Sequence, residues 1–282
     1  MTAIAQVAVP HTDRKPVRTG AAPAARPASP ARRRIVLHAT QVSIVVVLLA
    51  AWEIGANTGA VSRFLFASPS MIWEVLRLRI VSGELFVDIG TTTLEVLLGF
   101  VVGAVGGSVL GLLLWYSKWV ADLTAPFIAA IGAIPVLAIA PMTIIWFGTE
   151  ITSKVVIVAF SCVVVSLTSS YRGAQRTDTD LLNLMRSFGA SRTQTFLKLV
   201  VPSAMTWVVS GLKLNVGFAI VGAIVGEYIT SDAGVGHMIL LGSSNFSVNI
   251  VLAGVAVVMV MVLVLTLAVS ALERLILNWE RS

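Results

Sequence analysis

The segment LLNLMRSFGASRTQTFLKLVVP, residues 181–202, is a polar and basic island between two long apolar stretches. Its pattern predicts two short helices joined at Gly189, because glycine commonly ends a helix in the left-handed conformation. Ser191 and Gln194 have the spacing of a capping box, which predicts the start of the second helix. The first helix presents one apolar face, formed by Leu181, Leu182, Leu184, Met185 and Phe188.

An amphipathic pair of helices of this kind has three uses that the sequence leaves open. The pair can lie on lipid headgroups. It can pack against its own membrane domain, or it can fill a groove on a soluble partner. The spacing of the apolar residues alone does not choose among the three.

The composition is that of an integral membrane protein of the all-α class. The 282 residues are 57% hydrophobic and 12% charged, whereas soluble domains carry about 25% charged residues. Several apolar runs are long enough to cross a bilayer as helices. The net charge of +6 does not indicate nucleic-acid binding, because the basic residues cluster at the ends of the apolar runs. Cys162 has no disulfide partner in the sequence and is expected to be a small core residue.

Six transmembrane helices are expected at about residues 35–56, 87–115, 123–147, 152–170, 204–226 and 248–275, with boundaries uncertain by about 2–4 residues. They follow a basic tail over residues 1–34 that is expected to be disordered. With the N-terminus in the cytoplasm, the cytoplasmic segments hold 15 Lys and Arg residues and the outer segments hold four. This bias predicts that both termini are cytoplasmic. The membrane domain then covers residues 35–282, and the polar island lies in a cytoplasmic loop over residues 171–203.

Two further patterns concern helix packing. The second span repeats glycine every fourth residue on one face, where another backbone can approach closely, at Gly99, Gly103, Gly107 and Gly111. In the third span, Pro135 and Pro141 each remove a backbone donor and are expected to kink or break the helix. Broken helices at membrane depth often line cavities, and simple structural kinks are the alternative interpretation.

Several polar residues fall within or beside the expected spans. Glu95 in the second span and Lys213 in the fifth are costly in a membrane unless they are paired or hydrated. One interpretation pairs them, or places Lys213 along a translocation path with Asn215 nearby. The alternative is that both side chains reach an interface by snorkelling. Glu227 and Asp232 flank the outer end of the fifth span and are interpreted as part of an interface or receptor-docking loop.

The island resembles the EAA loop of ABC importer permeases, in which Glu-Ala-Ala is followed by three residues, a glycine and a later apolar residue before proline. Gly189-Ala190, Phe196 and Val201-Pro202 occupy the matching positions. Asn183-Leu184-Met185 stands at the Glu-Ala-Ala positions, so the acid is missing. Over residues 60–280 the chain is similar to the nitrate/sulfonate/taurine branch of these permeases, through the segments FASPS (66–70), APMTIIWFG (140–148), GLKL (211–214), GEY (226–228) and GVGHMI (234–239).

The resemblance implies the type I ABC importer fold and a place in the bacterial inner membrane. It implies a second permease copy, two cytoplasmic ATPases and an extracytoplasmic binding protein as partners. ATP and Mg²⁺ would bind to the ATPase, because this sequence has no G-x-x-x-x-G-K-[ST] motif. No enzymatic activity, metal or cofactor is expected in this chain. The loop would be a coupling helix that enters a cleft of the ATPase through Asn183, Leu184, Met185, Phe188, Gly189, Ala190, Phe196 and Pro202.

The substrate implied by the resemblance is a small anion such as nitrate, a sulfonate or taurine. A small heterocycle, such as a pyrimidine or a vitamin precursor, is the alternative. An ion-coupled secondary transporter is a weaker alternative, because that class usually shows internal repeats and this sequence shows no convincing one. A channel or a scaffold would leave the capped helix–glycine–helix island unexplained.

Overall fold

The computed structural model describes residues 30–276, which fall into two units that meet after Ala50. Helix α1, Pro30–Thr58, crosses this boundary. In the first unit, residues 36–50 of α1 are exposed along their whole length, which suits an apolar helix surrounded by lipid. The predicted disordered tail lies outside the described residues, except that residues 30–34 are helical and correct its boundary.

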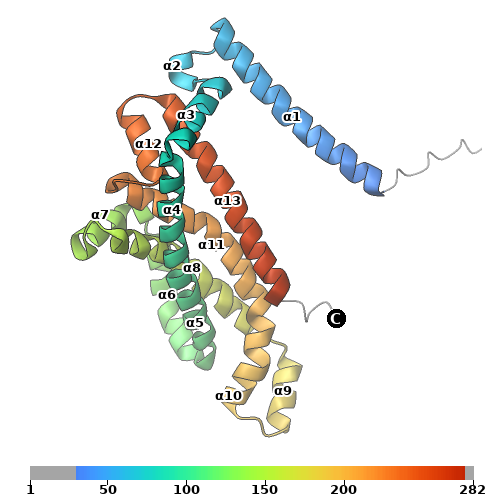
Figure 1. Cartoon of the computed structure of the whole chain (residues 1–282). Coiled ribbons are helices and arrows are strands. Elements are labelled where there is room, and N and C mark those ends of the chain that lie inside the picture. Colours follow the sequence, from blue (N-terminus) through green and yellow to red (C-terminus); the bar gives the residue numbers. More distant parts are fainter. Residues whose placement is uncertain (1–29, 277–282) are drawn as a thin grey trace, which may run out of the picture. The chain divides into compact units, whose positions relative to one another are not determined.

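The second unit is built from helices throughout its described residues (Figure 1). They are α2 Arg63–Phe66, α3 Pro69–Ser82, α4 Glu84–Phe100, η1 Val101–Val105, α5 Gly106–Leu113, η2 Leu114–Tyr116, α6 Lys118–Ala133, α7 Val136–Phe147, α8 Ile151–Gln175, α9 Thr179–Ser187, α10 Arg192–Thr195, η3 Phe196–Val200, α11 Val201–Ile229, α12 Val235–Ser244 and α13 Val248–Ile276. The sequence did not predict α3 or α12, which lie outside the long apolar runs.

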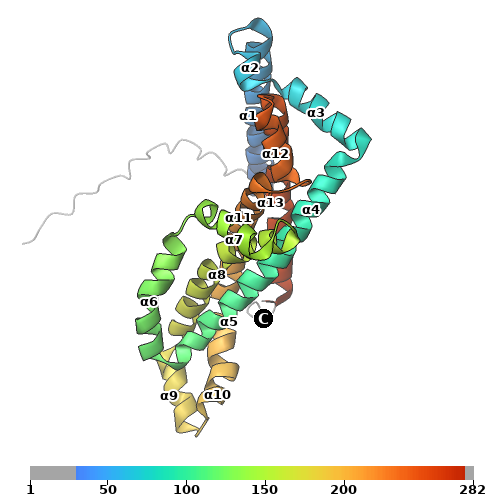
Figure 2. The same ribbon diagram turned by 90° about the vertical axis from the view of Figure 1, so that its left-hand side faces the viewer.

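The long apolar runs lie at approximately the predicted places, and they number six when the bent pair of α6 and α7 is counted as one broken span. Five runs of the described residues are long and apolar enough to cross a membrane: Val36–Thr58, Glu84–Tyr116, Ile151–Gln175, Arg192–Ile229 and Val248–Arg274. The remaining span is broken, because α6 and α7 are bent by 92° relative to each other (Figure 2). The break falls at Pro135, where the sequence predicts it, whereas α7 continues through Pro141.

The fifth span is longer than predicted. The expected second small helix and the expected span at 204–226 form one helical run of 38 residues, Arg192–Ile229, made of α10, η3 and α11. The segment η3 is a π-helical turn. Pro202 cannot donate to the carbonyl of Lys198, four residues earlier, and a π turn at this point accommodates the missing bond without ending the helix.

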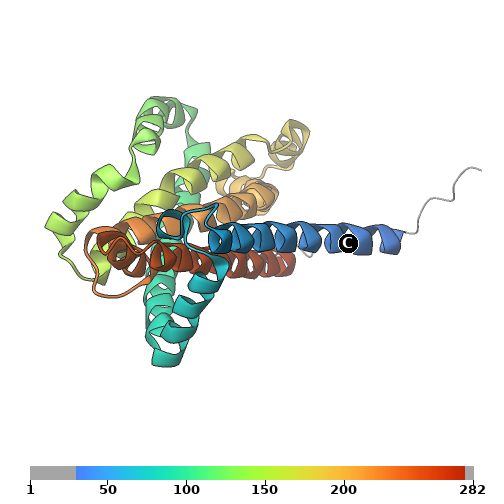
Figure 3. The same cartoon turned by 90° about the horizontal axis from the view of Figure 1, so that it is seen from above.

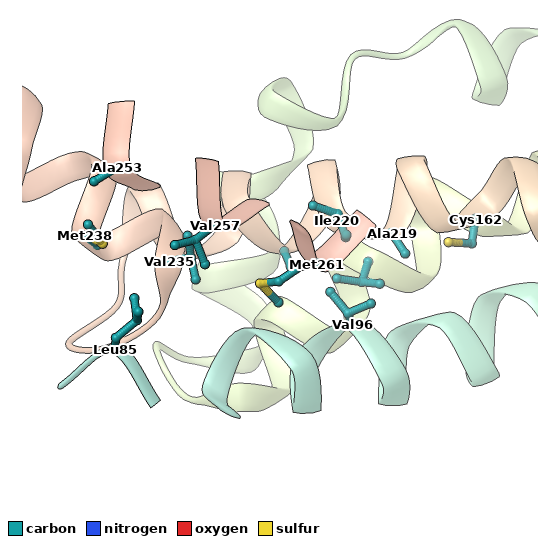
Figure 4. Packing of buried hydrophobic residues seen from close by; sticks show 12 residues of the cluster. Leu85, Val96, Cys162, Ala219, Ile220, Val235, Met238, Ala253, Val257 and Met261 are labelled. Carbon is teal, nitrogen blue, oxygen red and sulfur yellow. The ribbon is translucent and has the colours of Figure 1, made fainter. Parts of the chain in front are cut away.

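The core of the second unit lies between α8 and α11. Seen from above, α11 runs between α8 and α13 (Figure 3). The main buried cluster draws side chains from α4, α8, α11, α12 and α13, and Figure 4 shows these side chains between the helices. Cys162 of α8 is fully buried in this cluster, as expected from its apolar surroundings in the sequence.

The short helices of the second unit gather at its two ends. Helices α9 and α10 lie at one end, and α3 and α12 lie at the other (Figures 1 and 2). The polar island of the sequence and the outer loop before α12 are therefore separated by the length of the spanning helices.

Candidate functional site

Helix α9 is capped at both ends by hydrogen bonds from neighbouring residues. Asp178 Oδ1 accepts a hydrogen bond at 2.8 Å from the backbone N–H two residues later. At the other end, Gly189 has a φ of +73° and donates to the Arg186 carbonyl at 2.9 Å, while Ala190 donates to the Met185 carbonyl at 3.0 Å. This is a Schellman turn, in which glycine takes the left-handed conformation without strain.

The start of α10 has the capping box that the sequence predicts. Ser191 Oγ accepts a hydrogen bond from the Gln194 N–H at 3.2 Å, and Gln194 Oε1 accepts one from the Ser191 N–H at 2.8 Å. These bonds follow directly on the turn at Gly189, so the reversal between α9 and α10 is held from both sides. We call residues 178–195 the docking loop, after the role that the resemblance implies for this segment.

The apolar face of α9 divides into a covered and an uncovered part. Leu182 packs against a small buried cluster around Phe196. On the uncovered part, Leu181 is exposed, Leu184 is 50% exposed and Phe188 is 79% exposed. Exposed apolar side chains on the spanning helices meet lipid, but α9 lies outside those runs. An apolar patch on such a segment marks an interaction surface.

The remaining predicted residues of the docking loop differ in exposure. Asn183, at the position of the missing acid, is exposed, and its backbone carbonyl accepts a hydrogen bond from Ser187 Oγ at 3.0 Å. Met185 and Ala190 are half-buried. Asn183 therefore supports the helix through its backbone, and its amide side chain points to no partner within the described part of the chain.

One of the residues expected on the docking surface belongs to the packing of the chain itself. Phe196 is buried against Trp115 and Tyr116, with ring centroids 5.7 and 4.7 Å from its own. Pro202 lies in the first turn of α11. The burial of Phe196 corrects its expected place on an ATPase contact, whereas Pro202 is half-buried and its expected role stays a prediction.

The glycine repeat faces α8 at backbone contact. A Cβ added to Gly103, Gly107 or Gly111 would lie between 2.2 and 2.4 Å from a carbonyl oxygen of α8. A Cβ added to Gly99 would lie 2.4 Å from the side chain of Val158. The structure therefore places a helix against the face that the spacing predicts, and a larger residue there would push the two helices apart.

Side chains of α4 and α11 bind the start of α12 inside the protein. The N–H groups of residues 234–236 donate to Asp88 Oδ1, Thr92 Oγ1 and Glu227 Oε2 at 2.9, 2.9 and 2.5 Å. Thr92 Oγ1 also donates to Glu227 Oε1 at 2.6 Å, and Arg79 Nη1 of α3 pairs with Asp88 Oδ2 at 2.9 Å. The backbone donors that a helix start leaves unpaired are thus satisfied by other helices. This network fixes the outer loop to the membrane domain.

The network corrects the interpretation of Glu227. The sequence places Glu227 beside Asp232 at an outer interface, but the structure buries Glu227 completely and leaves only Asp232 exposed. Gly234 has a φ of +119°, and an added Cβ there would lie 2.4 Å from the carboxyl carbon of Glu227. Both the backbone conformation and the space therefore require glycine at this position.

The predicted pair between Glu95 and Lys213 does not form. Lys213 Nζ of α11 makes an ion pair with Glu273 of α13. Glu95 is 2% exposed and lies beside Glu227 and Lys154. Lys213 and Glu95 therefore have separate charged neighbours, and the prediction that they meet is wrong.

Asn215 is buried between helices. Its Nδ2 donates to Ser166 Oγ of α8 at 2.5 Å, and the residue has no exposed surface. The structure does not bring Asn215, Glu95 and Lys213 together, and their place along a translocation path stays a prediction.

Sequence reasoning missed Asp88 and Thr92 as members of the polar network. Asp88, Thr92 and Glu95 follow one another at spacings of four and three, which puts a polar stripe on one face of an apolar helix. That stripe was the available signal. Among the residues that the structure describes, no group of three or more His, Cys, Asp or Glu side chains is arranged to hold a metal ion.

Two transport permeases are similar to this chain over most of their length. The putative aliphatic sulfonates transport permease of Bacillus subtilis (strain 168) is 29% identical over 236 residues, which cover 84% of this chain and 86% of that protein. The formylaminopyrimidine transport permease of Halalkalibacterium halodurans is 29% identical over 237 residues, covering 84% of this chain and 94% of that protein.

A solved structure and a family match extend the comparison. The fold resembles a chain of the inward-facing MetNI methionine ABC transporter, with a TM-score of 0.56 and 16% identity, covering 73% of this chain and 98% of that one. Residues 99–278 match the family described as binding-protein-dependent transport system inner membrane component. The match takes in the whole glycine face, the whole docking loop and the α12 network from Glu227 onward, and it covers more than half of the sequence. This chain belongs to that family, the membrane permeases of ABC importers.

Proposed function

We propose that this chain is the permease subunit of an ATP-driven importer and that its docking loop holds the ATPase. The observation that carries the proposal is the uncovered apolar face of α9. Leu184 and Phe188 project from a loop whose shape is fixed by its own caps, at the end of the molecule away from α12. A rigid apolar projection of this kind suits insertion into a groove of a soluble partner.

The assembly follows from this role. Two cytoplasmic ATPases that bind ATP and Mg²⁺ would dock on two copies of this chain. An extracytoplasmic binding protein would deliver the solute at the end that carries α12. The charge bias of the loops supports cytoplasmic N- and C-termini in a bacterial inner membrane. The chain from the start of α1 at residue 30 onward would form the translocating domain, and the residues before α1 a basic cytoplasmic extension.

For the substrate, we propose a small anion such as a sulfonate. The relative named as a permease for aliphatic sulfonates favours this anion. A small heterocycle is the second candidate, because another relative is named as a permease for formylaminopyrimidine. The ligand is identified by purifying the partner binding protein and measuring which compounds it retains. Retention of a pyrimidine in preference to taurine or an alkanesulfonate would replace the first candidate with the second.

The docking role is tested with Phe188→Asp. Burying a phenylalanine side chain in a groove contributes about 1.5–3 kcal/mol, and a carboxylate in the same groove adds a desolvation cost. The variant should insert in the membrane normally, fail to retain the ATPase in a detergent pull-down and lose ATP-driven uptake. Phe188→Leu is the matched control, because it keeps an apolar side chain, and it should retain the ATPase. Uptake and ATPase retention that both survive Phe188→Asp would contradict the proposal and favour an ion-coupled transporter.

A further inference from the structure

A polar cavity lies beside the uncovered face of α9, between α9, α10 and η2. It has a volume of about 420 Å³ and is lined by Trp115, Leu182, Arg186, Ala190, Arg192 and Thr195. Two of these six side chains are cations, and no acidic side chain lines the cavity. A concave site with this lining is suited to an anionic group.

The two arginines have different roles in the cavity. The Arg192 guanidinium donates to the Tyr116 carbonyl and lies 5.7 Å from the ring centroids of both Trp115 and Tyr116. Arg192 is therefore held in place by η2. Arg186 is exposed and makes no ion pair or hydrogen bond through its side chain among the residues that the structure describes. One cation is thus fixed and the other is free to bind.

The net charge of the wider polar segment, residues 171–203, also favours an anionic ligand. Residues 171–203 hold five Lys and Arg residues and two acids. Both acids, Asp178 and Asp180, stand at the start of α9, where Asp178 caps the helix. Arg186 lies in the last turn of the same helix, and Asn183 leaves the middle of the helix without a carboxylate. The end of the loop beside Phe188 therefore carries uncompensated positive charge.

We propose that this cavity receives a carboxylate side chain of the ATPase, bound by Arg186 and Arg192 while Phe188 enters the neighbouring apolar groove. This rests on the proposed docking function and assigns the charge of the contact: cations on the permease and an acid on the ATPase. Guanidinium groups bind carboxylates through paired, charge-assisted hydrogen bonds. Arginine beside an aromatic anchor is also a composition enriched at the energetic centre of protein interfaces. A patch that only met lipid headgroups would not need a cavity with one preset cation.

The first test measures ATPase binding to the permease in detergent at 50 and 500 mM NaCl. Arg186→Ala should weaken binding about 10-fold at low salt, because it removes a charge-assisted contact. The difference should shrink to about twofold at high salt, where charges are screened. Lys198→Ala is the matched control: Lys198 is an exposed cation of the same cytoplasmic segment that does not line the cavity, and its loss should change binding less than about twofold.

The second test locates the carboxylate. In Arg186→Lys, a zero-length carbodiimide should join residue 186 to one acidic residue of the ATPase, identified by mass spectrometry. The unsubstituted chain, which keeps Lys198, gives the background of the reaction. A cross-link from residue 186 above that background supports the proposal, and its absence in a complex that still forms overturns it.

The outcomes separate this inference from the docking function. If Phe188→Asp abolishes binding but Arg186→Ala leaves it unchanged at both salt concentrations, the docking function stands and the carboxylate site is wrong. If Phe188→Asp leaves the ATPase bound, both are wrong. If Arg186→Ala weakens binding only in nanodiscs that contain phosphatidylglycerol, and not in detergent, the cavity binds a lipid headgroup and the inference is overturned.

Discussion

Replacing Gly107 with alanine should force apart two helices that touch through their backbones. A Cβ at this position would lie 2.4 Å from the Val163 carbonyl oxygen and 3.0 Å from the Ser166 Cβ. Carbon–oxygen contacts between packed helices begin at about 3.3 Å, so α5 and α8 would have to separate by about 1 Å. The adjoining Gly106 offers a matched control, because a Cβ added there points into open space.

The comparison of the two alanine variants isolates the packing cost. Both substitutions gain up to about 1 kcal/mol from the higher helix propensity of alanine. Only Gly107→Ala overpacks a tight contact, which costs about 1–3 kcal/mol. The free energy of unfolding of Gly107→Ala should therefore be lower than that of Gly106→Ala by about the same 1–3 kcal/mol. For a chain of this size, the unfolding midpoint should differ by about 2–12 °C.

The assay is thermal unfolding of each purified variant in the same detergent, followed as the loss of the monodisperse peak on size-exclusion chromatography. All samples must be heated at one rate, because unfolding of membrane proteins is often irreversible and the midpoint then depends on the scan. Equal midpoints for the two variants, or a higher midpoint for Gly107→Ala, would refute the backbone contact between α5 and α8.

Three further results are expected. Thr92→Val should lower the free energy of unfolding by about 1–3 kcal/mol, because it removes the hydroxyl that bonds both one oxygen of the Glu227 carboxylate and a buried N–H. Thr93→Val, in the lining of an apolar pocket, should be nearly neutral, and equal losses in the same thermal assay would contradict the network. A double-mutant cycle with Lys213→Met and Glu273→Gln should give a coupling free energy of unfolding of about 0.5–1 kcal/mol, because the ion pair is partly exposed. If the two changes in unfolding free energy simply add, the ion pair does not contribute to stability. Single cysteines in a Cys162→Ser background test the topology by labelling with an impermeant maleimide. Cysteines at residues 118 and 187 should react only from the cytoplasmic side, and one at residue 243 only from the outside; labelling of residue 187 from the outside would contradict the predicted topology.

The spanning helices and the docking loop were predictable because their signals are local. A run of about 20 apolar residues fixes a transmembrane helix by itself, and the caps at Asp178, Gly189 and Ser191 all involve neighbours within five residues. The break at Pro135 is likewise a property of one residue type. Local rules failed before Pro202, where a continuous helix with a π turn replaced the expected boundary between the second small helix and the fifth span.

The polar network could not be predicted, because its partners are distant in the sequence. Thr92 and Glu227 are 135 residues apart, and Asp88 and Gly234 are 146 apart. From the sequence, Glu227 at the end of a span is expected on the surface, but in the structure the start of α12 covers it. The same reason explains the wrong pairing of Lys213: Glu273 and Glu95 both lie on apolar helices, and only the packing of α13 against α11 selects between them.

The unbroken run Arg192–Ile229 has a mechanical consequence. Its 38 residues make a rod about 57 Å long, nearly twice the thickness of the bilayer's hydrocarbon core. One end of the run lies at the docking loop, and near the other end Glu227 accepts a hydrogen bond from the start of α12. A tilt of about 5° around the midpoint of such a rod would swing each tip by about 2.5 Å in opposite directions. A rigid tilt would therefore move the docking loop and the start of α12 together, and the π turn at Phe196–Val200 is where the helix would bend most readily.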